Sequence, residues 1–176
     1  DPRLNVILYH IPPISQMALS LNLIADLRER YPSVIAGVKD SSGDLDNMAA
    51  MAEAFPDLSI FAGADPYLLP LLKKGGAGCI TATSNIIASD LAFVYRHFND
   101  SKKAEEAEKA QQRVTDIRAL VSRWPQMSAL KAALAHFYDE PGWGRMRPPL
   151  MPLTPGQKSA LEAALGATQI KLPKAE

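Results

Sequence analysis

Residues 34–44 read VIAGVKDSSGD, an apolar run that ends at one basic residue and passes directly into a polar turn. An apolar run of this length between turn residues is typical of a strand buried in a parallel sheet. Lys39 closes the run at a position where proteins normally exclude charge. Burial favours the uncharged form of an amine, and an uncharged lysine amine attacks ketones to give an imine. The segment therefore predicts an α/β fold with a reactive lysine at a strand end.

A structural role for Lys39 is the alternative that these residues leave open. Lysines are rarely buried, and one at the end of a strand commonly points into solvent. The ammonium could also pair with the carboxylate of Asp40, the next residue. Residues elsewhere in the chain are needed to distinguish these two interpretations of Lys39.

The same unit, an apolar strand followed by a turn and an amphipathic helix, recurs along the first half of the chain. Strands are predicted at residues 5–9, 34–39, 58–62 and 77–81. Helices are predicted at residues 20–30, 66–74 and 89–97, and a further helix is capped by Asp44 or Asp46 and carries Met48 to Phe55. Strands that alternate with helices indicate a parallel sheet with right-handed crossovers. We expect four strand–helix units to fill residues 1–98.

Residues 99–176 are predicted to form a C-terminal helical region. A mixed-charge helical segment starts near Lys102 and continues towards Trp124, and such a charge run is typical of a salt-bridged surface. Further helices are expected at residues 128–138 and 157–165, on either side of a link rich in proline and glycine.

Composition excludes several classes of function. Lys and Arg total 19 and Asp and Glu total 19, so no basic field favours a nucleic-acid partner. No apolar stretch approaches the ~20 residues of a membrane span, so no membrane partner is expected. The single cysteine, Cys79, excludes a cysteine cluster, and His97 and His136 lack the spacing of metal ligands. We expect a soluble cytoplasmic protein without a metal or a cofactor.

Residues suited to chemistry fall at the carboxyl ends of successive predicted strands. They are Tyr9, Lys39, Gly63 with Asp65, and Thr81 with Asn85. Parallel α/β folds bind their ligands at this edge of the sheet, so the residues are expected to share one rim. A tyrosine beside a lysine imine can relay protons, because its hydroxyl both donates and accepts.

Five motifs follow one another along the chain. They are Leu8-Tyr9-His10-Ile11-Pro12, Gly37-Val38-Lys39-Asp40-Ser41-Ser42-Gly43-Asp44, Gly63-x-Asp65, Gly75-Gly76-Ala77-Gly78-Cys79-Ile80-Thr81 and Arg147-Pro148-Pro149-Leu150. In this order they resemble the motifs of the dihydrodipicolinate synthase and N-acetylneuraminate lyase family, which are class I, Schiff-base-forming aldolases. That family has a (β/α)₈ TIM barrel followed by C-terminal helices, and this chain resembles its second half, strands five to eight. The resemblance therefore implies a fragment of a longer protein.

The resemblance also implies roles for individual residues. Lys39 would form a Schiff base with pyruvate or another 2-keto acid, and Tyr9 would shuttle the proton as the carbinolamine collapses. The substrate-binding candidates are Gly63, Asp65, Ile80 and His10. A small-molecule 2-keto acid is the expected partner, and homo-oligomers, tetramers or dimers, are expected from the family. Its threonine-bearing turn after an earlier strand, which holds the keto-acid carboxylate, is absent from these residues.

Two departures from the family pattern bear on the substrate. The synthase branch usually has an arginine two residues after the Tyr-x-x-Pro proline, where this chain has Ile14, so a bidentate contact to a carboxylate is lost. The sialic-acid lyase branch usually has a glutamate where Pro66 follows Asp65. The sequence thus favours a lyase that cleaves, condenses or dehydrates a 2-keto-3-deoxy sugar acid.

Three alternatives stand beside this hypothesis. The chain could belong to a dihydrodipicolinate synthase, or to a non-catalytic scaffold that keeps a relic pocket. It could also bind phosphate at Gly75-Gly76-Ala77-Gly78, but this turn lacks the lysine and hydroxyl residue of a P-loop and precedes a strand instead of a helix. The phosphate interpretation is therefore the weakest of the three.

Overall fold

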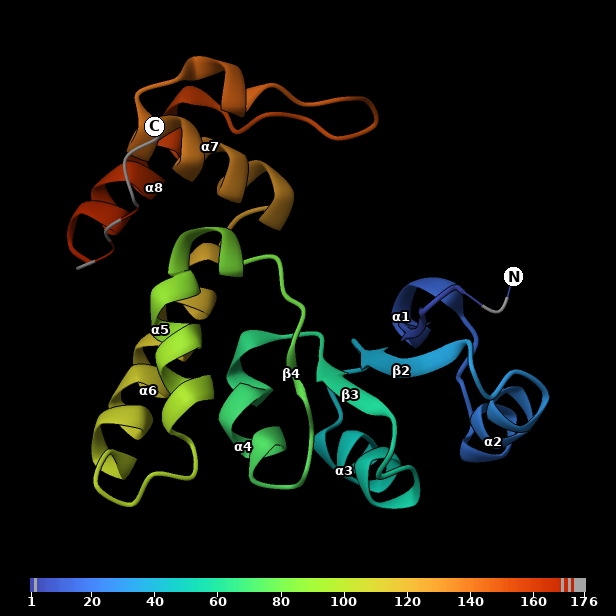
Figure 1. Ribbon diagram of the computed structural model, residues 1–176. Coiled ribbons are helices and arrows are strands. Elements are labelled where there is room, and N and C mark those ends of the chain that lie inside the picture. The colour runs from blue at the N-terminus through green and yellow to red at the C-terminus, as the bar shows by residue number, and fades with distance from the viewer. Residues whose placement is uncertain (2, 169, 171, 173–176) are drawn as a thin grey trace.

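The computed structural model describes residues 1, 3–168, 170 and 172 (Figure 1). Its strands are β1 (Val6–His10), β2 (Ile35–Asp40), β3 (Ser59–Ala62) and β4 (Gly78–Cys79). Its α-helices are α1 (Pro12–Ser15), α2 (Leu21–Arg30), α3 (Leu45–Ala54), α4 (Leu68–Leu72), α5 (Ser84–His97), α6 (Ala104–Val121), α7 (Gln126–Tyr138) and α8 (Pro155–Gly166). Two 3₁₀ turns, η1 (Asp65–Tyr67) and η2 (Pro141–Gly144), complete the described elements.

The four described strands form one parallel sheet in the order β1-β2-β3-β4. Tyr9 pairs with Lys39, and Lys39 pairs with Phe61 on the next strand, so these residues lie at one level of the sheet. The parallel α/β arrangement predicted from the alternation of strands and helices is confirmed. That this sheet is the second half of a barrel stays a prediction, and so does a domain boundary after residue 98.

Several element boundaries differ from those predicted. The fourth strand is shorter than residues 77–81, and the helix predicted at residues 66–74 is a 3₁₀ turn followed by the short α4. Helix α5 begins earlier than residue 89 and is kinked at Ile87, where φ of −132° and ψ of 24° are not helical. The first turn of α5 was missed because the polar sequence Thr83-Ser84-Asn85 is typical of a turn.

Side-chain caps define the starts of α2 and α3. The Ser20 hydroxyl accepts a hydrogen bond from the Leu23 amide, as expected for the predicted cap. Of the two candidates for the next helix, Asp44 is the cap, because its carboxylate accepts from the amides of Asp46 and Asn47. These caps fix the residue at which each of the two helices begins.

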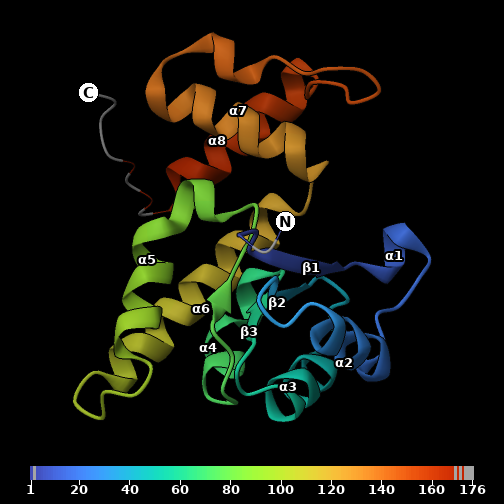
Figure 2. The same cartoon turned by 45° about the vertical axis from the view of Figure 1, so that its right-hand side comes forward.

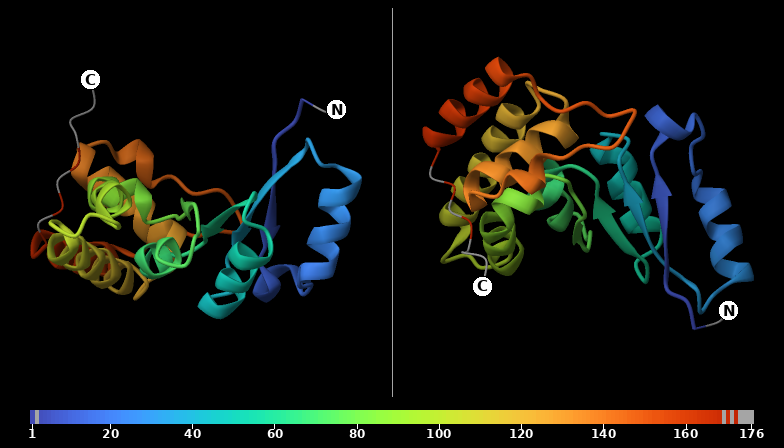
Figure 3. Two further views of the ribbon diagram at one scale, coloured as in Figure 1. Left: turned by 60° about the horizontal axis from the view of Figure 1, so that its bottom comes forward. Right: turned by 90° about the horizontal axis from the view of Figure 1, so that it is seen from above.

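Helices α2 and α3 cover one face of the sheet (Figures 2 and 3). Val38 and Ile60 point to this face and are buried against Ile24 of α2 and the methionines of α3, Met48 and Met51. Both methionines are core residues. The alternate residues of β1, Ile7 and Tyr9, are 38% and 50% exposed. The side chains of the strands thus divide between a helix-covered face and an open face.

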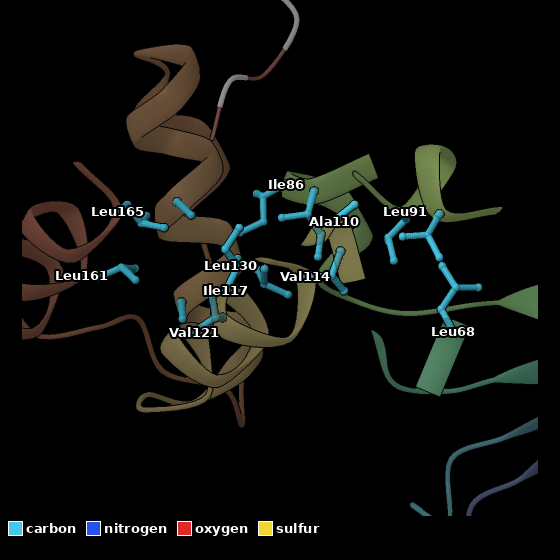
Figure 4. Close-up of a cluster of buried hydrophobic side chains, with 14 of the residues drawn as sticks. Leu68, Ile86, Leu91, Ala110, Val114, Ile117, Val121, Leu130, Leu161 and Leu165 are labelled. Atoms are coloured by element: carbon cyan, nitrogen blue, oxygen red, sulfur yellow. The ribbon is translucent and has the colours of Figure 1, made fainter. Parts of the chain in front are cut away.

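A second hydrophobic cluster joins α4 and α5 to the C-terminal helices (Figure 4). Leu68 of α4, Ile86 of α5 and Val114 of α6 meet Leu130 of α7 and Leu161 of α8 in this cluster. The outer face of α6 carries the predicted salt bridges, including those between Lys103 and Glu106 and between Lys109 and Glu105. Within the described ranges, no helix combines the length and the apolar character needed to cross a membrane.

Candidate active site

Tyr9 and Lys39 form the centre of the candidate site. They are direct neighbours across the β1–β2 ladder, and the Lys39 Nζ lies 4.1 Å from the centroid of the Tyr9 ring. This distance is within the range of a cation–π contact. Lys39 is half-buried, less buried than its apolar run suggested, because the sheet face that it shares with Tyr9 is open. Strand pairing alone brings the amine and the phenol together.

Asp40 holds the turn that follows Lys39. Its carboxylate is fully buried on the helix-covered face, where Oδ1 accepts from the Ser42 amide at 2.7 Å and Oδ2 accepts from the Asn47 amide group at 2.7 Å. Successive residues of a strand point to opposite faces, so Asp40 turns away from Lys39. The carboxylate therefore orders the turn and the start of α3, and the structure does not use it to pair with the Lys39 amine.

Gly63 brings the end of β3 against this turn. A Cβ at this position would collide with the Ser41 Oγ and with the carbonyl oxygen of Asp40. The Gly63 amide donates to that same carbonyl at 2.6 Å. A residue without a side chain is therefore required here, and its backbone comes close to the end of β2.

The Ser41 hydroxyl faces the phenol of Tyr9. Its Oγ donates to the Tyr9 Oη over a distance of 3.5 Å. This hydrogen bond and, to a lesser degree, the charge of Lys39 lower the pKa of Tyr9 below its ordinary value, although desolvation acts in the opposite direction. The environment thus eases the loss of the phenolic proton, which a proton relay requires.

A pocket of about 430 Å³ opens above these residues. Three predicted site residues line it, namely Tyr9, Lys39 and Gly63. Its far wall comes from the helical region and consists of Arg118, Gln126 and Met127. A larger pocket of about 570 Å³ between α5 and α6 contains none of the predicted site residues.

The other three candidates do not line this pocket. His10 is buried on the helix-covered face, where its Nδ1 accepts from the Leu19 amide at 3.0 Å, which is a structural contact. Ile80 follows β4 and is 43% exposed. Asp65 is fully buried behind the pocket wall. The structure thus brings together half of the predicted set and leaves the rest outside the lining.

Asp65 anchors a polar network that reaches the pocket. Its Oδ1 accepts from the Thr81 hydroxyl at 2.5 Å, and its Oδ2 lies 3.8 Å from the Arg118 Nη1. The Arg118 Nη1 also donates to the buried Thr83 hydroxyl at 3.3 Å. Gln111 donates to the Asp65 carbonyl and accepts from the Leu69 amide. The network ties the ends of β3 and β4 to α6.

Sequence reasoning missed the helical wall. Arg118 lies within a charged amphipathic helix, where an arginine is typical of the solvated face, and Gln126 starts α7 without any motif. The only signal was indirect: Ile14, at the position where the synthase branch has an arginine, lines the pocket and is 77% exposed. This side chain offers the pocket no hydrogen bond, so polar contacts in the lining come from other residues.

Cys79 lies on β4 and is half-buried. Burial and the nearby charge of Asp65 raise the pKa of its thiol to about 11. A thiol that stays protonated at neutral pH is a poor nucleophile.

Comparison with known proteins places these features in a family. The sequence pattern described as "Dihydrodipicolinate synthetase family" matches residues 1–168. An uncharacterized DapA-like lyase of Halobacterium salinarum is 36% identical over 161 residues, which is 91% of this chain and 51% of that protein. The 4-hydroxy-tetrahydrodipicolinate synthase 1 of Halalkalibacterium halodurans is 32% identical and is matched over 92% of this chain and 54% of its own length.

A solved structure shows the same arrangement. The dihydrodipicolinate synthase of Cyanidioschyzon merolae, crystallised with lysine bound, superposes with a TM-score of 0.81 at 30% identity, over 94% of this chain and 55% of that one. This chain spans about half the length of the curated relatives that it matches. The matched family pattern covers nearly all of the chain, from the strand that carries Tyr9 to the last helix. The chain belongs to the dihydrodipicolinate synthetase family.

Proposed function

We propose that this chain is part of a lyase that works through a Schiff base between Lys39 and pyruvate or a related 2-keto acid. The observation that carries the proposal is the contact between the Lys39 amine and the Tyr9 ring at the mouth of a pocket. Membership of a family that contains named synthases and lyases supports it. The proposed substrate resembles a 2-keto-3-deoxy sugar acid.

The proposed reaction starts with attack of the uncharged Lys39 amine on the keto carbon. Tyr9 gives a proton to the oxygen of the carbinolamine, which leaves as water, and the nitrogen lone pair forms the imine. The imine then withdraws electrons from the adjacent carbon. In condensation, the Tyr9 phenolate left by the dehydration takes a proton from that carbon, and the imine becomes an enamine. The enamine carbon bonds to an aldehyde carbon, and the Tyr9 hydroxyl gives the proton to the resulting alkoxide. In cleavage the same steps run in reverse: Tyr9 takes the hydroxyl proton, the carbon–carbon bond breaks, and the proton passes to the enamine carbon.

The substrate assignment rests on two side chains. Ile14 cannot make the bidentate contact that an arginine offers to a carboxylate, which disfavours aspartate-semialdehyde. Pro66 offers neither a charge nor a side-chain hydrogen bond where the sialic-acid branch has a glutamate, which disfavours sialic acid. A 2-keto acid whose hydroxylated tail is shorter than that of sialic acid is consistent with both Ile14 and Pro66.

Dihydrodipicolinate synthase is the second candidate. It is favoured by the names of several relatives, including the synthase of Halalkalibacterium halodurans. A non-catalytic scaffold is the third, and it is the outcome to accept if Lys39 forms no adduct. We also propose that the four strands are the second half of a (β/α)₈ barrel in the longer protein, and that this protein forms homo-oligomers.

Steady-state assays of the full-length protein test the proposal. We expect turnover of 2-keto-3-deoxy sugar acids to pyruvate and an aldehyde, and complete loss of that turnover in Lys39→Ala. Lys73→Ala is the matched control, because Lys73 is an exposed lysine that pairs with Glu108 on the outside of the fold. Rapid condensation of pyruvate with aspartate-semialdehyde, and none with hydroxylated aldehydes, would instead select the synthase.

A further inference from the structure

The helical wall of the pocket contains two polar groups that protein contacts do not satisfy. Arg118 uses its Nη1 for Thr83 and Asp65, and its other nitrogens have no hydrogen-bond partner in the described part of the chain. The Nε2 of Gln126 is buried and has no hydrogen-bond partner among the described residues. Both side chains line the same pocket as Lys39. A buried polar group without a partner is costly, so the Gln126 amide in this pocket points to a ligand. The remaining Arg118 nitrogens belong to a side chain that is 25% exposed, so they can donate to the same ligand.

Arg118 is held in place before any ligand binds. Its side chain is 25% exposed, and the buried Asp65 lies 3.8 Å from its Nη1. Asp65 is itself fixed by the Thr81 hydroxyl, and the Thr83 hydroxyl accepts a hydrogen bond from the same Nη1 of Arg118. A guanidinium fixed in this way loses little freedom when it binds a further group.

The charge balance of the helical wall indicates which kind of ligand group it can bind. The carboxylate of Asp65 compensates the guanidinium of Arg118, so the wall offers several N–H donors with little net charge. Hydroxyl groups both donate and accept and carry no charge, whereas a carboxylate only accepts and needs a free positive charge. The wall therefore suits a hydroxylated carbon chain.

Apolar side chains border the polar groups. Met127, next to Gln126, is 53% exposed, and Ile14 lies in the lining contributed by the segment after β1. Such side chains can pack against the C–H groups of a sugar-like tail, while the wall bonds its hydroxyls.

We propose that Arg118 and Gln126 bind the hydroxyl groups at the end of the substrate that lies farthest from the Schiff base, and so make the enzyme selective for hydroxylated aldehydes. The inference rests on the proposed function, since it concerns the second substrate of the same pocket. It assigns selectivity to the C-terminal helices and leaves the chemistry to the strands.

The test compares two aldehydes of equal carbon number in condensation with pyruvate by the full-length protein. Glyceraldehyde carries two hydroxyls, and propionaldehyde carries none. We expect Arg118→Met to raise the KM for glyceraldehyde about 10- to 100-fold, as for a lost hydrogen bond to a charged group. The KM values for propionaldehyde and pyruvate should change by no more than about twofold. Arg113→Met is the matched control on the same helix, because Arg113 pairs with the half-buried Asp90 away from this pocket.

Gln126→Leu provides a second variant. It leaves the pair between Arg118 and Asp65 intact, and it should raise the KM for glyceraldehyde about 5- to 10-fold. If Arg118→Met fails to fold because Asp65 loses its compensating charge, Gln126→Leu alone tests the inference. Equal effects on both aldehydes, or no effect on either, would overturn the inference.

The outcomes also separate this inference from the proposed function. If wild-type protein treated with pyruvate and borohydride gains no reduced pyruvyl group on Lys39, the proposed function fails, and the inference fails with it. If the adduct forms but wild-type protein shows no preference for glyceraldehyde over propionaldehyde, only the inference on Arg118 and Gln126 is overturned.

Discussion

The two walls of the candidate pocket are built in different ways. On one wall Tyr9 and Lys39 project from paired strands, and backbone hydrogen bonds set their spacing. On the other wall Arg118 and Gln126 project from α6 and α7, and side-chain contacts to Asp65 and Thr83 set the position of the guanidinium. The strand wall depends on register, whereas the helical wall depends on individual side chains.

This difference suggests a division of labour. A parallel ladder keeps a lysine beside a tyrosine whatever the neighbouring side chains are, so the reacting pair can stay fixed while the second substrate changes. Side chains on helices can be exchanged without loss of the ladder. In this account, replacements on the strand wall abolish chemistry, and replacements on the helical wall alter selectivity.

The largest effect short of removing Lys39 is expected for Tyr9→Phe. Loss of the hydroxyl removes the proposed proton relay and should lower kcat about 10²- to 10⁴-fold. Tyr67→Phe is the control, because Tyr67 also lines the pocket but its hydroxyl donates a hydrogen bond to the Gly43 carbonyl at 2.7 Å. Equal losses of kcat in both variants would contradict the special role of the strand pair.

Asp40→Ala tests whether the turn supports the strand wall. The variant loses two hydrogen bonds to a buried carboxylate and leaves the Ser42 amide without its partner, so the free energy of unfolding should fall by about 2–4 kcal/mol. Denaturant unfolding of the full-length protein measures this. Asp46→Ala, at an exposed residue in the first turn of α3, should cost only about 0.3–1 kcal/mol. A loss no larger than that control would show that the turn is held by other contacts.

Ser41→Ala should change the titration of Tyr9 with a smaller effect on rate. The Ser41 hydrogen bond is the main cause of the lowered pKa, so its removal should raise the pKa of Tyr9 towards its ordinary value of about 10. Any alkaline limb of the pH–rate profile that reports this phenol should then move to higher pH. The tyrosinate absorbance of each protein, compared with its Tyr9→Phe counterpart, measures the shift. Ser42→Ala should leave the pKa in place.

The smallest effect on activity is expected at Cys79. Its pKa of about 11 should make alkylation by iodoacetamide at pH 8 about 100-fold slower than that of a free thiol, because the thiolate is correspondingly rare. Cys79→Ala should leave kcat/KM within about twofold of the wild-type value. Rapid labelling, or a large loss of kcat/KM, would place a reactive group on β4 that this account lacks.

The strand wall was predictable from the sequence, and the helical wall was not. Apolar runs with a period suited to strands located the sheet, and parallel register placed the ends of neighbouring strands side by side. Arg118 has no such signal, since its role depends on a buried Asp65 that is distant in the sequence. His10 shows why proximity in the sequence is not enough: this histidine beside Tyr9 lies on the other face of the strand, because side chains alternate.

The most direct test of the account is borohydride trapping on the full-length protein. Incubation with pyruvate and borohydride, followed by peptide mass mapping, should find one reduced pyruvyl group on Lys39, and the group should be absent from Lys39→Ala. Pyruvyl groups on exposed lysines such as Lys73 and Lys74 instead, or on Lys39→Ala to the same extent, would contradict the proposed Schiff base.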